Sequence, residues 1–287
     1  MKTTLAICAL VIALLGVRTA FGQAADAGAD AQTKDKDAVE IDYFGRMTSE
    51  ELEARLDNAT IVLRSDPDSS LQFVFSRGEK ESYGAPYRVY GLMKTYLLYR
   101  KVDMNRVVAT FCKPQAKASG QIWLINAGGT LRTCDQDDID ISATTLFDNA
   151  PSATGRGNDY GCCIVDTFGP AAAAESVRAF AQLLKRYPAS RAYVYAYGGT
   201  NVYWTTDSRG RNKAVRNPDT AKDIAVLSRK VRHILAQNGI PASRIITRSS
   251  GYSDAVARVE MWIVPPGGEI PKTSANYPQK KRYKRPS

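Results

Sequence analysis

The chain repeats itself, and this repeat limits the possible folds more than any other feature of the sequence. Ile122–Gly129 reads IWLINAGG and Met261–Gly268 reads MWIVPPGG, so both contain a Trp, aliphatic residues and a closing Gly pair. Upstream of these segments, Val102–Val108 aligns with Ile240–Ile246. Self-similarity of this kind indicates a structural unit that occurs twice. The sequence therefore predicts two copies of one domain, joined by a linker.

Two further alignments support the duplication, and the length of the chain allows it. Leu56–Pro67 aligns with Val177–Pro188, and Phe73–Phe75 aligns with Tyr193–Tyr195. A chain of 287 residues is long enough for two domains of ordinary size. Hydrophobic residues make up 44% and charged residues 24% of the chain, which is an ordinary globular composition and excludes disorder over the whole length.

Apolar patterns predict the order β-α-β-α-β-β in the first copy. A capping box at Thr48 and Glu51 indicates the start of the first helix, which is expected to end near Pro67. The other expected elements are the strands Val39–Phe44, Leu71–Phe75, Arg106–Phe111 and Gln121–Asn126 and the helix Tyr87–Lys101. Alternating strands and helices imply parallel crossovers, and the last two strands indicate a hairpin. We therefore expect an α+β fold in which each copy has one mixed sheet, helices on one face, and an opposite face that needs a partner or water.

The second copy is expected to have the same order of elements. The expected strands are Cys162–Phe168, Arg191–Tyr197, Arg244–Arg248 and Val259–Val264, and the helices are Ala171–Arg186 and Ala221–Asn238. Compared with the first copy, it contains an insert, Val202–Thr220, that is rich in Arg, Asn and Asp. Function varies most in loops, so this insert is the first place to search for a binding site.

The N-terminus has the pattern of a secretory signal peptide. Lys2 is followed by an apolar run from Leu5 to Val17, and Ala20 and Gly22 are the small residues that a signal peptidase requires. The apolar run is too short for a stable membrane span, and no later segment reaches about 18 consecutive apolar residues. We expect an exported protein, in the periplasm or cell envelope or secreted, whose mature chain has no transmembrane segment. An uncleaved N-terminal anchor is the alternative.

These patterns divide the chain into six parts. They are a signal peptide (1–22), a flexible spacer (23–38), repeat 1 (39–131), a linker (132–158), repeat 2 (159–271) and a basic disordered tail (272–287). The cationic residues of the tail are Lys272, Lys280, Lys281, Arg282, Lys284 and Arg285. Such a tail either binds an anionic surface or is a solvated terminus that aids solubility. Nucleic acid is not an expected partner, because export separates the chain from it.

Four cysteines follow the signal peptide, and an exported chain permits disulfides. Cys162 and Cys163 are adjacent and are not expected to pair with each other. Three full pairings exist, and a bond from Cys134 to Cys162 or Cys163, which would join the two repeats, is the one we favour. Cys112 is the fourth cysteine. No metal site is predicted, because CxxC spacing is missing and His233 is the only histidine.

The second copy resembles the OmpA-like domain family. The resemblance rests on the pattern GI-x-x-x-RI, read at Gly239–Ile245, which follows a long helix and precedes a final paired strand. The same domain occurs in MotB-type motor proteins and in peptidoglycan-associated lipoproteins. In that family an Asp of a Gly-His-Thr-Asp motif and an Arg of the next helix hold the diaminopimelate of peptidoglycan non-covalently. The resemblance covers nearly all of repeat 2 and, more faintly, repeat 1, and it implies peptidoglycan binding without a cofactor.

The binding motif of that family is incomplete in this chain. Gly198–Asn201 reads GGTN at the motif position, so Asn201 is a neutral acceptor in place of the anionic Asp. The motif Arg aligns with Leu227, and Arg229 is the nearest substitute. In the first copy the matching loop is Ser76–Glu79, and Arg88 lies near the start of the next helix. Neither copy keeps the complete pair.

The leading hypothesis is a non-enzymatic cell-envelope protein that binds peptidoglycan or an envelope partner and carries no cofactor or metal. The candidate ligand-binding residues lie beside or within the insert and in the helix after it: Asn201, Asp207, Arg209, Asp223 and Arg229. An ordinary polar surface is the alternative for these side chains. Asp207–Gly210 also has the composition of a simple turn.

A second hypothesis, from a different class, is a structural or assembly subunit that uses the sheet faces of two tandem domains for protein–protein contact. Tyr193, Tyr195 and Tyr197 alternate along one strand, so their rings share one face that suits a core or a partner. An enzyme is not predicted. His233 is expected in the apolar stripe of a helix as a structural residue, and Ser249–Gly251 lacks the flanking Gly of a nucleophile elbow.

Overall fold

The computed structural model describes residues 37–136, 139, 141–151, 165–199, 202–216, 221–252 and 257–272. We call residues 37–136 the first half and residues 139–272 the second half. The segment expected to be a signal peptide, most of the expected spacer and nearly all of the expected basic tail lie outside the described residues, as do Asn201, Cys162 and Cys163. No described helix combines the length and apolarity that a membrane crossing requires.

The described elements of both halves follow one another in the same order. The first half contains β1 (Ala38–Phe44), α1 (Ser49–Ser65), β2 (Ser70–Gly78), α2 (Ala85–Tyr99), β3 (Val107–Gln115) and β4 (Ser119–Ile125). The second half contains β5 (Thr145–Pro151), α3 (Val165–Arg186), β6 (Arg191–Gly198), β7 (Val202–Thr206), β8 (Asn212–Arg216), α4 (Ala221–Gln237), β9 (Ile245–Tyr252) and β10 (Arg258–Val264). The additional hairpin β7–β8 occupies the insert expected from the sequence.

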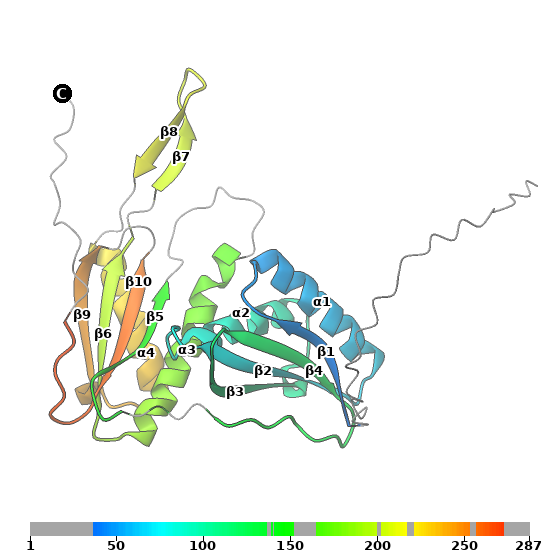
Figure 1. Cartoon of the computed structure of the whole chain (residues 1–287). Helices are drawn as coiled ribbons and strands as arrows, with labels where there is room; N and C mark the ends of the chain where they lie inside the picture. Colours follow the sequence, from blue (N-terminus) through cyan, green and yellow to red (C-terminus); the bar gives the residue numbers. More distant parts are fainter. Residues whose placement is uncertain are drawn as a thin grey trace, which may run out of the picture. The chain divides into compact units, whose positions relative to one another are not determined.

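The two halves also have the same sheet topology. The strand order is β1-β4-β2-β3 in the first half and β5-β10-β6-β9 in the second (Figure 1). In each sheet two neighbouring pairs are antiparallel, and the pair β2–β3 or β6–β9 is parallel. The protein is therefore of the α+β class, with a mixed four-stranded sheet in each half. β7 and β8 form a separate two-stranded sheet.

An arginine contact is repeated in the two halves. Arg106 directly precedes β3, and Arg244 directly precedes β9. Each donates hydrogen bonds from Nε and Nη2 to carbonyls around the end of the first helix of its half, α1 or α3. The acceptors are Leu63, Asp66 and Ser69 at 2.7–3.0 Å in the first half, and Leu184, Tyr187 and Ser190 at 2.8–2.9 Å in the second. The last carbonyls of a helix lack intrahelical partners, so one guanidinium satisfies them and joins helix to sheet. This contact, with the strand registers, aligns the two halves residue by residue.

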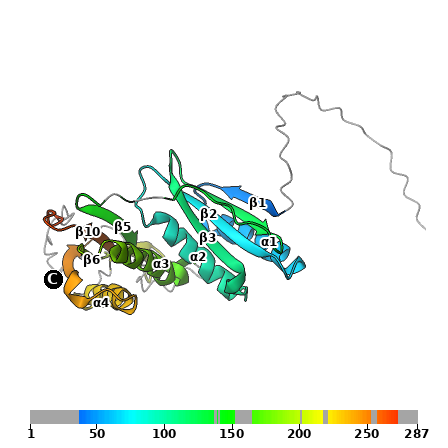
Figure 2. The same ribbon diagram turned by 90° about the horizontal axis from the view of Figure 1, so that it is seen from below.

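Both helices of each half pack on one face of its sheet, as the sequence predicts (Figure 2). The first core includes Leu56 of α1, Leu97 of α2 and Phe73 of β2, and the second includes Phe180 of α3, Leu227 of α4 and Val194 of β6. The expected capping box opens α1: the Thr48 hydroxyl accepts from the Glu51 N–H at 3.2 Å, and the Glu51 carboxylate accepts from the Thr48 N–H at 2.8 Å.

The first strand of the second half is not where the sequence pattern places it. The pattern predicts a strand at Cys162–Phe168, but Val165–Phe168 belongs to α3. The first strand of this sheet is β5, at the edge opposite β9, and it lies within the segment expected to be a linker. β5 places only Phe147 and Ala150 among the buried apolar residues, so it lacks the alternation that identifies a strand. The Ala-rich sequence after Phe168 favours helix and overrides the strand propensity of the residues before it.

The alignment of β2 with β6 requires a correction of one residue. The sequence match pairs Phe73 with Tyr193, whereas the registers of the neighbouring strands align Phe73 with Val194. A shift of one residue exchanges the two faces of a strand. Tyr193, Tyr195 and Tyr197 therefore lie on the face away from the helices, where they are buried.

The chain itself contacts the helix-free face of each sheet with the segment that follows the last strand of the half. In the first half, buried Gln72 donates to the Arg132 carbonyl at 2.8 Å and accepts from the Arg132 N–H at 2.7 Å. In the second half, the Tyr195 hydroxyl donates to the Pro271 carbonyl at 2.8 Å. The interior of each half thus extends to both faces of its sheet.

The disulfide differs from the one favoured on sequence. Cys134 bonds to Cys112 of β3, within the first half, and not to Cys162 or Cys163. The segment after β4, which covers the helix-free face around Arg132, is here called the covering segment. A bridge between Cys112 and Gln136 pairs this covering segment with β3, and the Cα atoms of Cys112 and Cys134 are 5.6 Å apart. This separation is the usual one for a disulfide. The bond therefore fastens the covering segment of the first half, and the sequence contains no signal for that path of the chain.

A row of aromatic rings connects the two cores. Tyr87 of α2 stacks on Phe111 of β3, with 4.0 Å between ring centroids. Tyr87 also approaches Phe147 of β5, and Phe147 packs against Phe180 of α3 at 5.1 Å. The halves are therefore packed against each other through α2, β5 and α3, and α2 and α3 lie side by side (Figure 1).

Buried Asp148 of β5 adds a polar contact to this junction. Its carboxylate pairs with Arg88 of α2 and accepts from the Ser176 hydroxyl of α3 at 2.5 Å. The equivalent residue of the first half is Asp42, which pairs at 2.5 Å with Arg55 on α1 of the same half. Ser176 occupies the position of Arg55. The aspartate of the second half is thus paired with an arginine of the first half, whereas the equivalent aspartate of the first half is paired with an arginine of its own half.

Candidate ligand-binding groove

A groove lies between α4 and the edge strand β9. It has a volume of about 210 Å³, and its described lining residues are Ala225, Ser228, Arg229 and Arg232 of α4 and Thr247, Arg248 and Ser249 of β9. None of these residues is acidic, and the lining includes three arginines. The groove is therefore a basic, hydroxyl-rich surface.

The sequence of α4 explains why the arginines face the groove. Ile224, Leu227, Val231 and Leu235 form the apolar stripe that packs on the sheet. Arg229 and Arg232 lie three residues apart beside this stripe, and both side chains are exposed. Within the described part of the chain, neither guanidinium forms an ion pair. The Ser228 hydroxyl donates to the Ile224 carbonyl at 3.2 Å, so its oxygen can still accept a hydrogen bond.

Small side chains explain why the groove is hollow. In the alignment of the halves, Ala225, Ser228 and Ser249 correspond to aromatic residues of the first half. These residues are Tyr87, Tyr90 and Phe111, whose rings contact one another. Replacement of three rings by a methyl group and two hydroxyls leaves space between the helix and the edge strand. The groove is thus specific to the second half.

Two of the residues singled out from the sequence lie in a turn. Asp207 and Arg209 connect β7 to β8, and the Asp207 carboxylate accepts from the N–H groups of Arg209 at 2.9 Å and of Arg211 at 3.0 Å. Together with the Arg211 guanidinium, these hydrogen bonds lower the pKa of Asp207, chiefly through the backbone N–H of Arg211. Gly210 has a φ of +74°, which suits glycine. The interpretation of Asp207–Gly210 as a turn is confirmed.

The other candidate residues have different positions. Arg229 lines the groove, whereas Asp223 lies in the first turn of α4 and Asn201 is outside the described residues. Sequence reasoning did not select Arg232, although the spacing of three residues from Arg229 indicates one helix face. Thr247 was also missed, because nothing in the sequence brings β9 next to α4.

The expectation for His233 was wrong. It is exposed on α4 and does not belong to the apolar stripe, which passes through Val231 and Leu235. Among the described residues, no group of three or more His, Cys, Asp or Glu side chains is arranged to hold a metal ion. The fold and groove define an α+β protein of two equivalent halves, with a basic groove among the described residues of the second. Comparisons with protein-family models, curated proteins and solved structures find no match to this chain.

Proposed function

We propose that this chain is a non-enzymatic, exported cell-envelope protein with two OmpA-like halves, and that the α4–β9 groove binds carboxylates of peptidoglycan. The observation that carries the proposal is the position of Arg229. It is the nearest substitute for the ligand-binding arginine of the family that the sequence resembles, and it lies in a basic groove beside Arg232.

The chemistry of the groove suits a carboxylate. Guanidinium groups bind carboxylates through two parallel hydrogen bonds, and such charge-assisted bonds are about twice as strong as neutral ones. Ser228, Thr247 and Ser249 add hydroxyl groups for the rest of a peptide. The volume of about 210 Å³ is below the roughly 300–1,000 Å³ of pockets that enclose drug-sized ligands. The groove therefore fits one charged end of a polymer.

The incomplete motif changes what the groove recognises. Asn201 replaces the Asp that pairs with an ammonium group in the resembling family, so this chain has a weaker partner for a cation at that position. Arg229 and Arg232 favour the anionic groups of the ligand instead. The basic tail is proposed to add affinity for the anionic envelope surface.

Retention on purified sacculi tests the proposal. We expect the purified chain to be retained, and Arg229→Ala/Arg232→Ala to lower retention by about tenfold or more, because two charge-assisted contacts are lost. Lys185→Ala/Arg191→Ala removes two exposed cations from other surfaces of the second half and is the matched control. Equal retention of the two double variants, or no retention of the unmodified chain above an unrelated protein, would refute the proposal.

The sheet faces are less suited to assembly than the sequence suggests. Tyr193, Tyr195 and Tyr197 are buried, and the segments around Arg132 and Pro271 contact the two helix-free faces. An assembly role consequently requires another surface, and the groove is one.

A further inference from the structure

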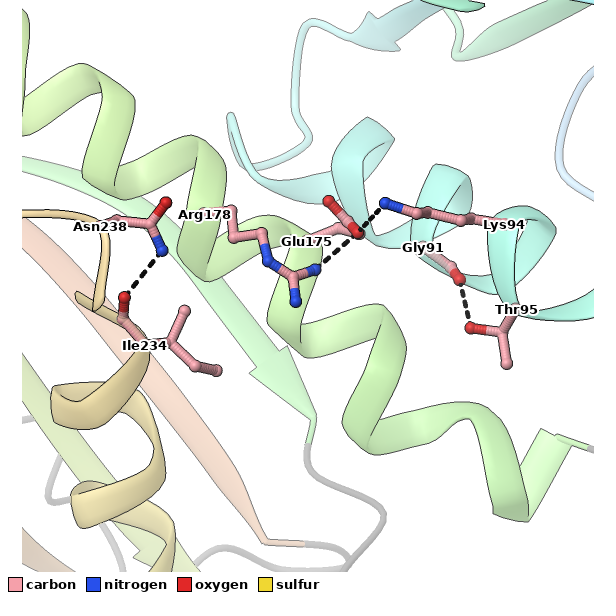
Figure 3. Close-up of polar contacts among 7 residues, drawn as sticks. All are labelled: Gly91, Lys94, Thr95, Glu175, Arg178, Ile234 and Asn238. Atoms are coloured by element: carbon pink, nitrogen blue, oxygen red, sulfur yellow. Dashed lines mark hydrogen bonds and ion pairs between the residues drawn. The ribbon is translucent and has the colours of Figure 1, made fainter. Parts of the chain in front are cut away.

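In the first half, the position of the groove is occupied by the second half. In the alignment of the halves, Arg229 and Arg232 of α4 correspond to Gly91 and Lys94 of α2. Lys94 forms an ion pair with Glu175 of α3, with 2.9 Å between Nζ and Oε1 (Figure 3). Gly91 is buried on the same helix. The surface that α3 covers on the first half is thus equivalent to the open groove on the second.

Two more groove residues, Ala225 and Ser228, correspond to residues of the first half that lie against the second half. Tyr87, which aligns with Ala225, packs on Phe147 and on the core of the second half. Burial, and to a smaller extent the nearby Glu175 carboxylate, raises the pKa of Tyr90, which aligns with Ser228. The four described groove residues on α4, of seven in all, therefore correspond to residues of α2, the helix that packs against α3.

The helix equivalent to α3 is α1, and it has an exposed surface of its own. Ala54 aligns with Glu175, and the exposed residues on the same side of α1 are Glu50, Glu51, Ala54, Asn58 and Ile61. The first turn of α1 is acidic, whereas the exposed face of α4 carries Arg229, Lys230 and Arg232. The charges of the two surfaces are complementary.

We infer that α1 of a second copy of this chain docks in the α4–β9 groove, so that copies join head to tail as the two halves join within one chain. The acidic first turn of α1 would meet Arg229 and Arg232, and Ala54, at the position of Glu175, would enter the space left by the small side chains of the groove. An interface between two different surfaces gives rings or open chains. As in the proposed function, the groove is taken as a recognition surface, but its occupant here is protein.

Substitutions that make the groove acidic or the α1 surface basic test this docking. Sedimentation velocity over a range of concentrations should reveal reversible association of the unmodified chain that weakens with salt. Arg229→Glu/Arg232→Glu and Glu50→Lys/Ala54→Lys should each weaken self-association by about tenfold or more, because like charges then face each other. Lys185→Glu/Arg191→Glu makes the same change in charge outside the groove and should associate like the unmodified chain. Circular dichroism confirms that each variant is folded.

Mixing the two charge-reversed variants provides the decisive measurement. In the mixture, the unmodified α1 of one variant meets the unmodified groove of the other, so association should return to within about threefold of the unmodified chain. A mixture that stays monomeric, or a groove variant that associates as well as the control, overturns the inference.

The same variants separate this inference from the proposed function. Self-association through the groove without retention on sacculi supports docking and refutes the peptidoglycan proposal. A strictly monomeric chain whose retention on sacculi depends on Arg229 and Arg232 supports the peptidoglycan proposal and refutes docking. If both activities depend on the groove, an excess of soluble sacculus fragments should dissociate the assembled chains.

Discussion

Replacing Arg88 by Met should destabilise the protein far more than replacing Arg55 by Met, although both arginines pair with equivalent aspartates. The side chain of Asp148 is 0% exposed and that of Arg88 is 24% exposed. For Asp42 and Arg55 the corresponding values are 21% and 36%. Burial strengthens the consequences of leaving one charge without its partner, so the two substitutions compare the same contact in two environments.

The expected magnitudes follow from this difference. Removal of one partner of a buried pair costs about 3–5 kcal/mol. The Asp148 carboxylate keeps hydrogen bonds from Ser82 at 2.6 Å, Ser176 at 2.5 Å and the Asn149 N–H at 2.8 Å, which reduces the loss to about 2–4 kcal/mol. The more exposed pair of Asp42 is worth about 1 kcal/mol or less. For a chain of this size, 1 kcal/mol shifts Tm by about 2–4 °C, so Arg88→Met should lower Tm by about 10 °C.

Urea unfolding followed by far-ultraviolet circular dichroism measures both changes, since the midpoint and slope give the free energy of unfolding. Arg88 lies at the junction of the halves, so its loss should also separate the unfolding of the second half from that of the first. Equal destabilisation by Arg88→Met and Arg55→Met, or a change below about 1 kcal/mol for Arg88→Met, would refute the reasoning.

Further outcomes are expected for four variants. Cys112→Ser/Cys134→Ser opens a loop with a sequence separation of 22 and should cost about 3 kcal/mol in urea unfolding; dithiothreitol should leave this variant unchanged and destabilise the parent chain. Burial and the hydrogen bond to the Asp57 carboxylate raise the pKa of Tyr96 to about 12, above its ordinary value of 10.0. The stability that the protonated hydroxyl contributes is therefore fully present below pH 10 and is lost as the pH rises towards 12. Tyr96→Phe should flatten the pH profile of the free energy of unfolding between these two values. Gly239 and Lys101 end α4 and α2 with φ values of +81° and +59°, so Gly239→Ala should cost about 1 kcal/mol and Lys101→Gly should stabilise by up to about 1 kcal/mol in thermal unfolding.

Much of the fold could be predicted because the local patterns agree with the tertiary structure. The paired Trp123 and Trp262 segments occupy equivalent strands, and both donate from the indole N–H to the side chain two residues earlier, at 3.2 and 3.4 Å. The capping box at Thr48 and the C-terminal Gly239 gave correct helix boundaries, because caps act over a single turn. For the same reason, the alternative interpretation of Asp207–Gly210 as a turn is confirmed, while ligand binding by Asp207 and Arg209 stays a prediction.

Most of the errors involve contacts between residues distant in the chain. β5 escaped detection because an edge strand with two buried apolar residues leaves little pattern, and its place in the sheet depends on pairing with β10. The sequence alignment of β6 with β2 was wrong by one residue, because β6 buries tyrosines on its helix-free face. The sequence alone gives no reason to place these tyrosines in a core and not on a surface. The Cys112–Cys134 bond depends on a covering segment whose path no local signal indicates.

The sequence by itself determined that one βα unit occurs twice, because a repeated pattern of apolar and polar residues buries the same core wherever it occurs. It also selected Arg229 as a candidate ligand-binding residue, which stays a prediction. Only the tertiary structure decided that the two halves differ at the surface between their second helix and edge strand. Tyr87 packs on β5 and stacks with Phe111, which Tyr90 also contacts, whereas Ala225, Ser228 and Ser249 leave a basic groove. The physical reason is that a surface becomes a groove or an interface through the side chains brought to it from elsewhere in the chain, and their arrival is a property of packing.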